Sequence, residues 1–424
     1  MTADSAPAEG PHPDEGSPKA PNPLGHGPVL LLANARLADG RVVDVRISGD
    51  RIQAVGTSGS LGPLPAVPGS PTSTTGARID LTGYLLLPAP AEPHAHYDVA
   101  FSAALPTPPP ETPPELIRRV TEGALTALGY GATAQRTHVR IGDVHGLRRL
   151  EAVLTARQAL RGLAELQAVA MPRLLTGRAG ADGRAQLRDA LKLGAAAAGG
   201  CPDLDPDPVG YVQILLEAAR EADCPVDLHT LGADPAQLSR MATLLAPLRP
   251  RVTVGPVSAL VDGGAAVLAG AGLRVVCLPQ NGGCVGLEGP AAPVRPFLVR
   301  ELTDAGLPLA AGAGGLRDLA NPVGRADPLE AAYLLATGGG LSPEAAYEAI
   351  SHQARAALGL QPVRVDAGFP AELLAVRGDS LAGALAGGHS RLVIHSGRVV
   401  SRTSAVREFA DTVALALPRQ STPG

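Results

Sequence analysis

The feature that most constrains the fold is an alternation of helical segments with short apolar runs, which begins near residue 115. Helix-like stretches such as "PELIRRVTEGALTALGYG" alternate with strand-like runs, among them "AQRTHVR", "AELQAVAMP", "CPVDLHT", "RVTVGPV" and "LRVVCLP". Consecutive parallel strands need a crossover connection, usually a helix, so this alternation predicts an α/β fold with a parallel sheet. At this length a closed barrel and an open sheet are both compatible with the pattern.

Strand-like sequence also marks both ends of the chain. "VLLLANARLADGRVVDVRISGDRIQAVG" has short alternating runs broken by turn sequences, and "AELLAVRG" and "RLVIHSGRVVS" resume this pattern after the last helix. We expect residues 27–88 and 364–403 to pair as one small β domain, with a barrel of residues 89–363 inserted between them. The Pro-, Gly- and acid-rich residues 1–26 are predicted to be a disordered tail, and residues 404–424 a C-terminal tail.

Composition argues against several classes of partner. The chain has 424 residues, a formal net charge of −4, no Trp and 2% aromatic residues. Nucleic acids are bound by clustered basic residues and by aromatic stacking, so no nucleic-acid partner is expected. No apolar run reaches the roughly 18 residues that indicate a membrane-spanning helix, so no membrane partner is expected either.

Cysteine usage and the N-terminus bear on the compartment. The four cysteines form no CxxC pair, which is typical of reduced thiols in a cytosolic protein. The N-terminus lacks the basic and apolar regions of a secretory signal. We therefore expect a cytoplasmic protein, and the sequence leaves a homo-oligomer open.

The stretch "LLLPAPAEPHAHYD", residues 85–98, ends an apolar run with two histidines one residue apart. Alternate residues of a strand share a face, so the side chains of His94 and His96 are predicted to point the same way. Neutral imidazole is a good ligand for Zn and Fe, and the C-terminal rim of a barrel carries the chemistry in such enzymes. Taken alone, the pair is also compatible with two histidines in a surface loop, which is the more common case.

Other histidines also follow predicted strands. His229, in "CPVDLHT", could be a third ligand, although a single histidine there is often a core or rim residue. His138, in "RTHVR", is interpreted as a hydrogen-bonding residue of the rim. The remaining histidines are interpreted as solvated or structural: His12, His26, His145, His352, His389 and His395.

The ordered set of these motifs resembles the amidohydrolase superfamily, and the EPHxHxD form resembles its cytosine-deaminase branch. The resemblance continues in register through "RTHVR", "VAMP", "GGCP", "VDLH", "RVTVGP", "LRDLANPVG" and "AGFPAELLAV", and covers roughly residues 28–402. It implies a (β/α)8 TIM-type barrel with a small β-sandwich domain formed from both chain ends. It also implies a metal-bound hydroxide that attacks a carbon bonded to nitrogen.

The resemblance places His94, His96 and His229 where the family has metal ligands, which implies one divalent metal, Zn or Fe. The family's Asp, which binds the metal and acts as general base, is replaced by Gly314. Because this anionic ligand is missing, we expect the metal to be weakly bound or absent.

Other catalytic positions of the family are substituted as well. Gly232 stands in place of the proton-shuttling Glu, and Pro256 in place of the His that orients the attacking water. The Gln that binds a substrate amide is replaced by Arg173, so Arg173 and His138 are the predicted substrate-binding residues. The nearest acids that could substitute are Asp318 and Asp234, both expected in loops.

Two functions remain open. The first is a metal-dependent hydrolase of non-peptide C–N bonds, acting on a nucleobase-like or other cyclic amide or amine, with deaminase activity lost or altered. General acid–base groups each contribute about 10²–10⁴-fold, so losing several predicts a pseudoenzyme. The alternative is an inactive barrel that binds a small molecule or regulates a partner, or that contributes only a surface.

Overall fold

The computed structural model describes the chain in segments separated by short gaps. These are residues 29–64, 66–67, 70–74, 76–103, 109–142, 146–230, 232–257, 260–280 and 296–406. The predicted tail of residues 1–26, most of the C-terminal tail, His145 and Cys284 lie outside the described residues.

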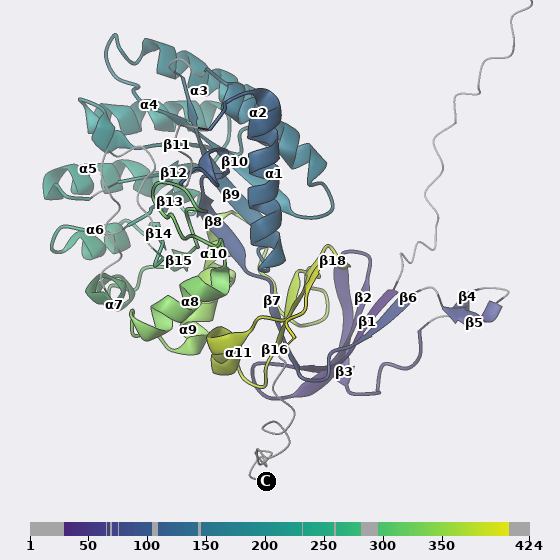
Figure 1. The fold of residues 1–424 in the computed structure, drawn as a ribbon. Helices are drawn as coiled ribbons and strands as arrows, with labels where there is room; N and C mark the ends of the chain where they lie inside the picture. The colour runs from purple at the N-terminus through teal and green to yellow at the C-terminus, as the bar shows by residue number, and fades with distance from the viewer. Residues whose placement is uncertain are drawn as a thin grey trace, which may run out of the picture.

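Eight parallel strands follow one another around a nearly closed barrel (Figure 1). Each strand pairs with the next one in the chain, so the order has no reversal of the kind that defines an open doubly wound sheet. The barrel prediction is therefore confirmed over the open-sheet alternative. The strands are β8 (Ala91–Ala95), β9 (Ala134–Ile141), β10 (Glu165–Pro172), β11 (Ala197–Gly200), β12 (Val226–Leu228), β13 (Val252–Val254), β14 (Arg274–Cys277) and β15 (Leu309–Ala311).

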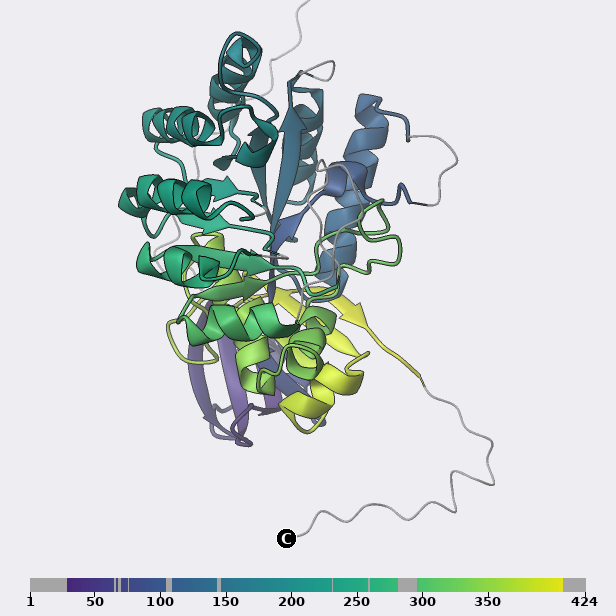
Figure 2. The ribbon, with the colours of Figure 1, turned by 90° about the vertical axis from the view of Figure 1, so that its left-hand side faces the viewer.

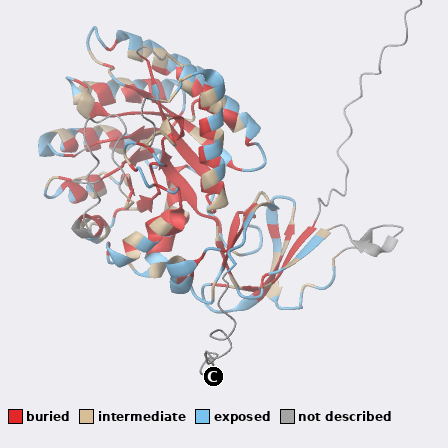
Figure 3. Ribbon diagram, viewed as in Figure 1, coloured by how far each residue is buried: buried red, intermediate tan, exposed pale blue. Residues whose placement is uncertain are grey.

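Helices surround the barrel and bury one face each against the strands (Figures 2 and 3). They are α1 (Pro113–Gly129), α2 (Arg148–Ala159), α3 (Ala181–Leu193), α4 (Pro208–Glu221), α5 (Pro235–Leu245), α6 (Gly264–Gly270), α7 (Pro296–Asp304) and α8 (Pro328–Thr337), followed by α9 (Pro343–Ile350) and α10 (His352–Ala357). In α10, Ala354 and Ala357 share a buried cluster with Ala91 and Ala134, which begin β8 and β9. Helix α10 therefore covers the N-terminal end of the barrel, which leaves the C-terminal strand ends as its mouth.

Several barrel helices begin with the same Asp-Pro pair. Asp207, Asp234 and Asp327 each accept a backbone N–H of the first turn, and a proline follows each of them. An acid at the N-cap satisfies a free helix donor, and proline at the next position loses no hydrogen bond. This local chemistry sets where α4, α5 and α8 start.

Both ends of the chain form one mixed sheet beside the barrel, as predicted (Figure 1). The ends are joined where β7 pairs antiparallel with β16, with Leu87 opposite Leu374. The strands are β1 (Val29–Arg36), β2 (Val42–Ser48), β3 (Arg51–Thr57), β6 (Gly76–Asp80) and β7 (Tyr84–Pro88), with β16 (Leu373–Arg377), β17 (Arg391–His395) and β18 (Arg398–Thr403). A short pair, β4 (Ala66–Val67) and β5 (Ser70–Thr74), and the helix α11 (Leu381–Gly387) complete this domain.

One buried ion pair joins the β domain to the barrel. The guanidinium of Arg391, on β17, contacts both carboxylate oxygens of Asp327 at 2.7 and 2.8 Å, and it also donates to the carbonyl of Tyr130. Both side chains of the pair are more than 90% buried. Because Asp327 also caps α8, the pair fixes the start of that helix against the β domain.

In the described part of the chain, no helix combines the length and the apolar character needed to cross a membrane.

Replacing Arg391 by Ala should destabilise the protein by about 3 kcal/mol or more, because it leaves the buried carboxylate of Asp327 without its cation. Urea unfolding measures this change in free energy. The control is Arg188→Ala, which breaks an exposed ion pair with Glu221 and should cost about 1 kcal/mol or less. Equal losses for the two variants would contradict the importance of the buried pair.

Candidate metal centre

Three histidines converge at the mouth of the barrel. His94 lies in β8, His96 directly follows that strand, and His229 directly follows β12. The Nε2 atom of His94 is 3.3 Å from Nε2 of His96 and 3.0 Å from Nε2 of His229. The structure thus brings together the three residues that the sequence predicted as metal ligands, across 135 positions of the chain.

The protonation of these rings suits a metal. The Nδ1 atom of His96 lies 3.0 Å from the carbonyl oxygen of His138, so this nitrogen carries the proton and Nε2 keeps its lone pair. Burial lowers the pKa of His96 to about 3 and holds the pKa of His94 and of His229 well below the usual value. Neutral imidazoles with their ring nitrogens facing one another are the form that binds Zn or Fe.

Hydrogen bonds between the three rings cannot satisfy all of the ring nitrogens that face one another. Nε2 of His94 faces two other ring nitrogens, and a single proton on it could be donated to only one of them. One ion would accept all three lone pairs at once, so the three histidines fit a single divalent metal.

His138 is fully buried behind the three histidines. Its ring stacks on that of His94, with centroids 3.9 Å apart and planes 24° apart. Among the described residues, His94, His138 and Asp227 form a second group with ligand atoms close together. Stacked rings cannot both point an in-plane lone pair at one ion, so this second group is a poor metal site.

Asp227 instead takes part in a buried polar network beneath the histidines. One of its oxygens is 2.8 Å from Arg136, and the other is 3.3 Å from Nε2 of His138. Burial raises the pKa of Asp227, but the interactions with His138 and Arg136 outweigh burial and lower it. Sequence reasoning missed this residue, although it precedes His229 by two positions and therefore shares its strand face.

Glu92 was missed in the same way, since it precedes His94 by two positions. Its buried carboxylate accepts the backbone N–H of His94 at 3.0 Å and that of Ala313 at 2.7 Å. Burial raises the pKa of Glu92 to about 7 against the opposing effect of these N–H groups.

Three of the positions at which the sequence was predicted to depart from the family pattern carry no acidic or basic side chain. Gly314 has a φ of +72°, and a Cβ built on it would lie 2.9 Å from Cδ1 of the buried Leu278. Gly232 has a φ of +61°, and Pro256 is buried. Arg173 follows β10 and is exposed.

The two nearby acids have structural partners. Asp234 is the N-cap of α5, and Asp318 accepts the N–H groups of Ala320 and Asn321 through one oxygen. Burial raises the pKa of Asp318, whose second oxygen has no hydrogen-bond partner. Neither acid belongs to the groups of potential metal ligands found among the described residues.

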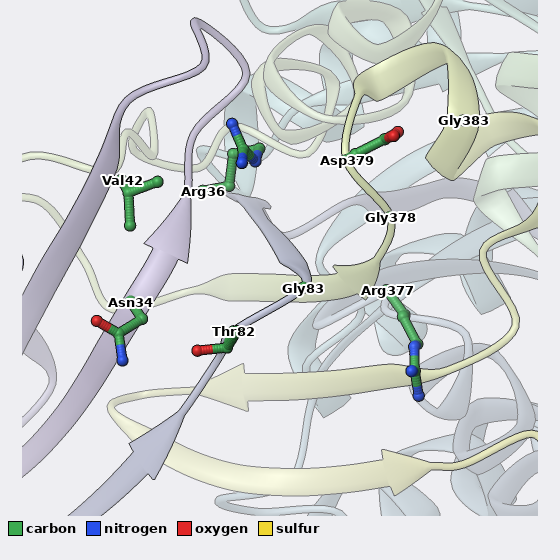
Figure 4. Close-up of a pocket in the computed structure, with 9 residues that line it drawn as sticks. All are labelled: Asn34, Arg36, Val42, Thr82, Gly83, Arg377, Gly378, Asp379 and Gly383. Atoms are coloured by element: carbon green, nitrogen blue, oxygen red, sulfur yellow. The ribbon is translucent and has the colours of Figure 1, made fainter. Parts of the chain in front are cut away.

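A cavity of about 790 Å³ lies elsewhere, in the β domain. It is lined by residues of β1 and β2, by the turn before β7 and by the segment from β16 to α11 (Figure 4). Arg36 and Asp379 stand on opposite sides of this cavity, and Arg377 points away from both. None of the three converging histidines lines it.

Comparison with known proteins agrees with this architecture. No family model matches the chain. The curated relative and the structural neighbours that the chain matches are amidohydrolases, and the cytosine-deaminase-like branch fits it.

Three relatives illustrate the match. N-isopropylammelide isopropyl amidohydrolase of Pseudomonas sp. (strain ADP) is 24% identical over 346 residues, which are 72% of this chain and 79% of the relative. The crystal structure of N-isopropylammelide isopropylaminohydrolase from Burkholderia multivorans ATCC 17616 has a TM-score of 0.73 and 28% identity, covering 89% of this chain and 99% of that one. The structure of 5-methylcytosine deaminase from Klebsiella pneumoniae, liganded with 5-fluorocytosine, has a TM-score of 0.71 and 21% identity, covering 91% and 100%.

Introducing Asp at position 314 should destabilise the protein rather than simply add a ligand. The left-handed backbone costs a residue with a Cβ about 1–2 kcal/mol, and the new Cβ must also displace the end of the buried Leu278 side chain. Urea unfolding of Gly314→Asp and Gly314→Ala measures this loss. Gly129→Ala is the control, because a Cβ there meets no neighbouring atom. An unchanged stability for both Gly314 variants would contradict the closed geometry.

Proposed function

We propose that this chain is a metal-dependent hydrolase of non-peptide C–N bonds by fold and ancestry, with standard deaminase activity lost or altered. The observation that carries this proposal is the convergence of three buried, neutral histidines as one group of potential ligands, while the carboxylate of Asp227 groups with His94 and His138 instead. His94, His96 and His229 would hold one divalent metal, Zn or Fe, which when bound lowers the pKa of a water and polarises the substrate.

Each residue of the site has a definable part in this proposal. The carbonyl of His138 fixes the tautomer of His96, and the ring of His138 stacks on the ring of His94 and so limits its orientation. The exposed Arg173 suits an anionic or carbonyl-bearing group on a cyclic, nucleobase-like ligand. We place this site in a barrel of residues 89–363, beside a β domain of residues 27–88 and 364–403.

Proton transfer is the step that the site lacks. Deamination needs one group to take a proton from water and another to deliver one to the ring and the leaving ammonia. Gly232, Pro256 and Gly314 carry no group for either task, Asp234 caps α5, and one oxygen of Asp318 already accepts the N–H groups of Ala320 and Asn321. These observations also support the alternative of a pseudoenzyme that binds a small molecule or regulates a partner.

Metal binding should be measurable but weak, because three neutral ligands lack the anionic partner that would strengthen the site. Titration with Zn²⁺ or Co²⁺ should show one site per chain that is emptied by dialysis against a chelator. His94→Ala should abolish it, whereas His352→Ala, in α10 at the opposite end of the barrel, should leave it unchanged. Stoichiometric metal that survives the chelator would contradict the weakness of the site.

Cytosine deamination should lie within experimental background. The test is ammonia release from a panel of pyrimidines and triazines, with Zn²⁺ or Fe²⁺ added. His94→Ala serves as the metal-free baseline for each substrate. Turnover of cytosine well above that baseline would overturn the loss of deaminase activity, and turnover of another ring alone would identify the altered substrate.

A further inference from the structure

We propose that Glu92 is a positioning residue at the barrel seam, the gap between the first strand β8 and the last strand β15. In this proposal its carboxylate fixes the backbone of His94 and that of the loop after β15, beneath the three histidines. The inference deepens the proposed function, because His94 is one of the proposed metal ligands.

The backbone ladder of the barrel is incomplete at this seam. Strands β8 to β15 are paired in chain order, and no ladder joins β15 back to β8 among the described residues. The pairing of β8 with β9 is also irregular, because its register shifts between Glu92 and Ala95. His94 thus lies in the irregularly paired segment of β8, and β8 is itself an end strand of the sheet, next to the seam.

The carboxylate of Glu92 bridges the gap that the ladder leaves. One oxygen accepts the backbone N–H of His94 at 3.0 Å, and the other accepts the N–H of Ala313 at 2.7 Å. The side chain is 1% exposed, so water does not replace these contacts. A buried N–H without an acceptor costs about 1–3 kcal/mol, so both strand ends depend on this one group.

The opposite side of the seam accommodates the carboxylate closely. A Cβ built on Gly312 would lie 2.2 Å from Oε1 of Glu92, so only glycine leaves room for the carboxylate at its observed position. Nearer the mouth, Phe101 and Ala103 donate their N–H groups to the carbonyls of Leu316 and Arg317. Glu92 therefore links the two sides of the seam below these hydrogen bonds, and it contacts a proposed ligand, His94.

Two substitutions disturb this bridge from opposite sides. Glu92→Gln keeps the volume, but its amide offers one acceptor and one donor where two N–H groups need acceptors. Gly312→Ala keeps the carboxylate and displaces it sterically. The matched control is Glu372→Gln, another buried carboxylate, which is bonded to His395 and to the N–H of Ser396 in the β domain.

The first readout is Co²⁺ binding, followed by its visible absorption spectrum. Loss of a group that orients a metal ligand typically weakens metal binding 10–100-fold. We expect both seam variants to weaken Co²⁺ binding at least tenfold and to shift the absorption bands. Glu372→Gln should lower the thermal midpoint without changing either property.

The second readout is hydrogen exchange at the Ala313 amide, which needs no metal. We expect at least tenfold faster exchange in Glu92→Gln, with no such change in the control. Unchanged Co²⁺ affinity, bands and exchange in both seam variants would overturn the inference. If the unmodified protein binds no Co²⁺, the proposed function fails, and the exchange rate at Ala313 alone decides whether Glu92 holds the seam.

Discussion

The parallel direction of the eight barrel strands is the constraint on which the rest of the structure depends. Because the strands run the same way, the residues that follow them all meet at one mouth, while α10 covers the other end. His94 and His96 reach the mouth from β8, His229 from β12 and the glycine-rich loop from β15. A chemical site is assembled there from segments more than a hundred residues apart.

Burial then decides the chemical character of that mouth. Three imidazoles removed from water are held neutral, and a fourth stacks behind them. The acids nearby have other partners: Asp227 pairs with Arg136, and Glu92, whose pKa is raised to about 7 by burial, accepts two backbone N–H groups. Three histidines that could together hold a metal ion therefore lie at the mouth of the barrel.

The loop after β15 leaves little room for a side chain at position 314. Gly314 has a left-handed backbone, and Leu278 fills the space that a side chain there would enter. Glycine at 312 makes room for the carboxylate of Glu92. The loop is therefore packed around its glycines.

The sequence by itself determined the parts of this protein that depend on local patterns. The helix–strand alternation specified a parallel α/β core, the β character at both ends specified the second sheet, and the HxH spacing specified two rings on one face. Only the tertiary structure decided that His229 meets them, that Asp227 pairs with Arg136, and that Glu92 bridges β8 and β15. The physical reason is range: side-chain periodicity acts over a few residues, whereas these contacts depend on barrel closure and on the space that remains between packed strands.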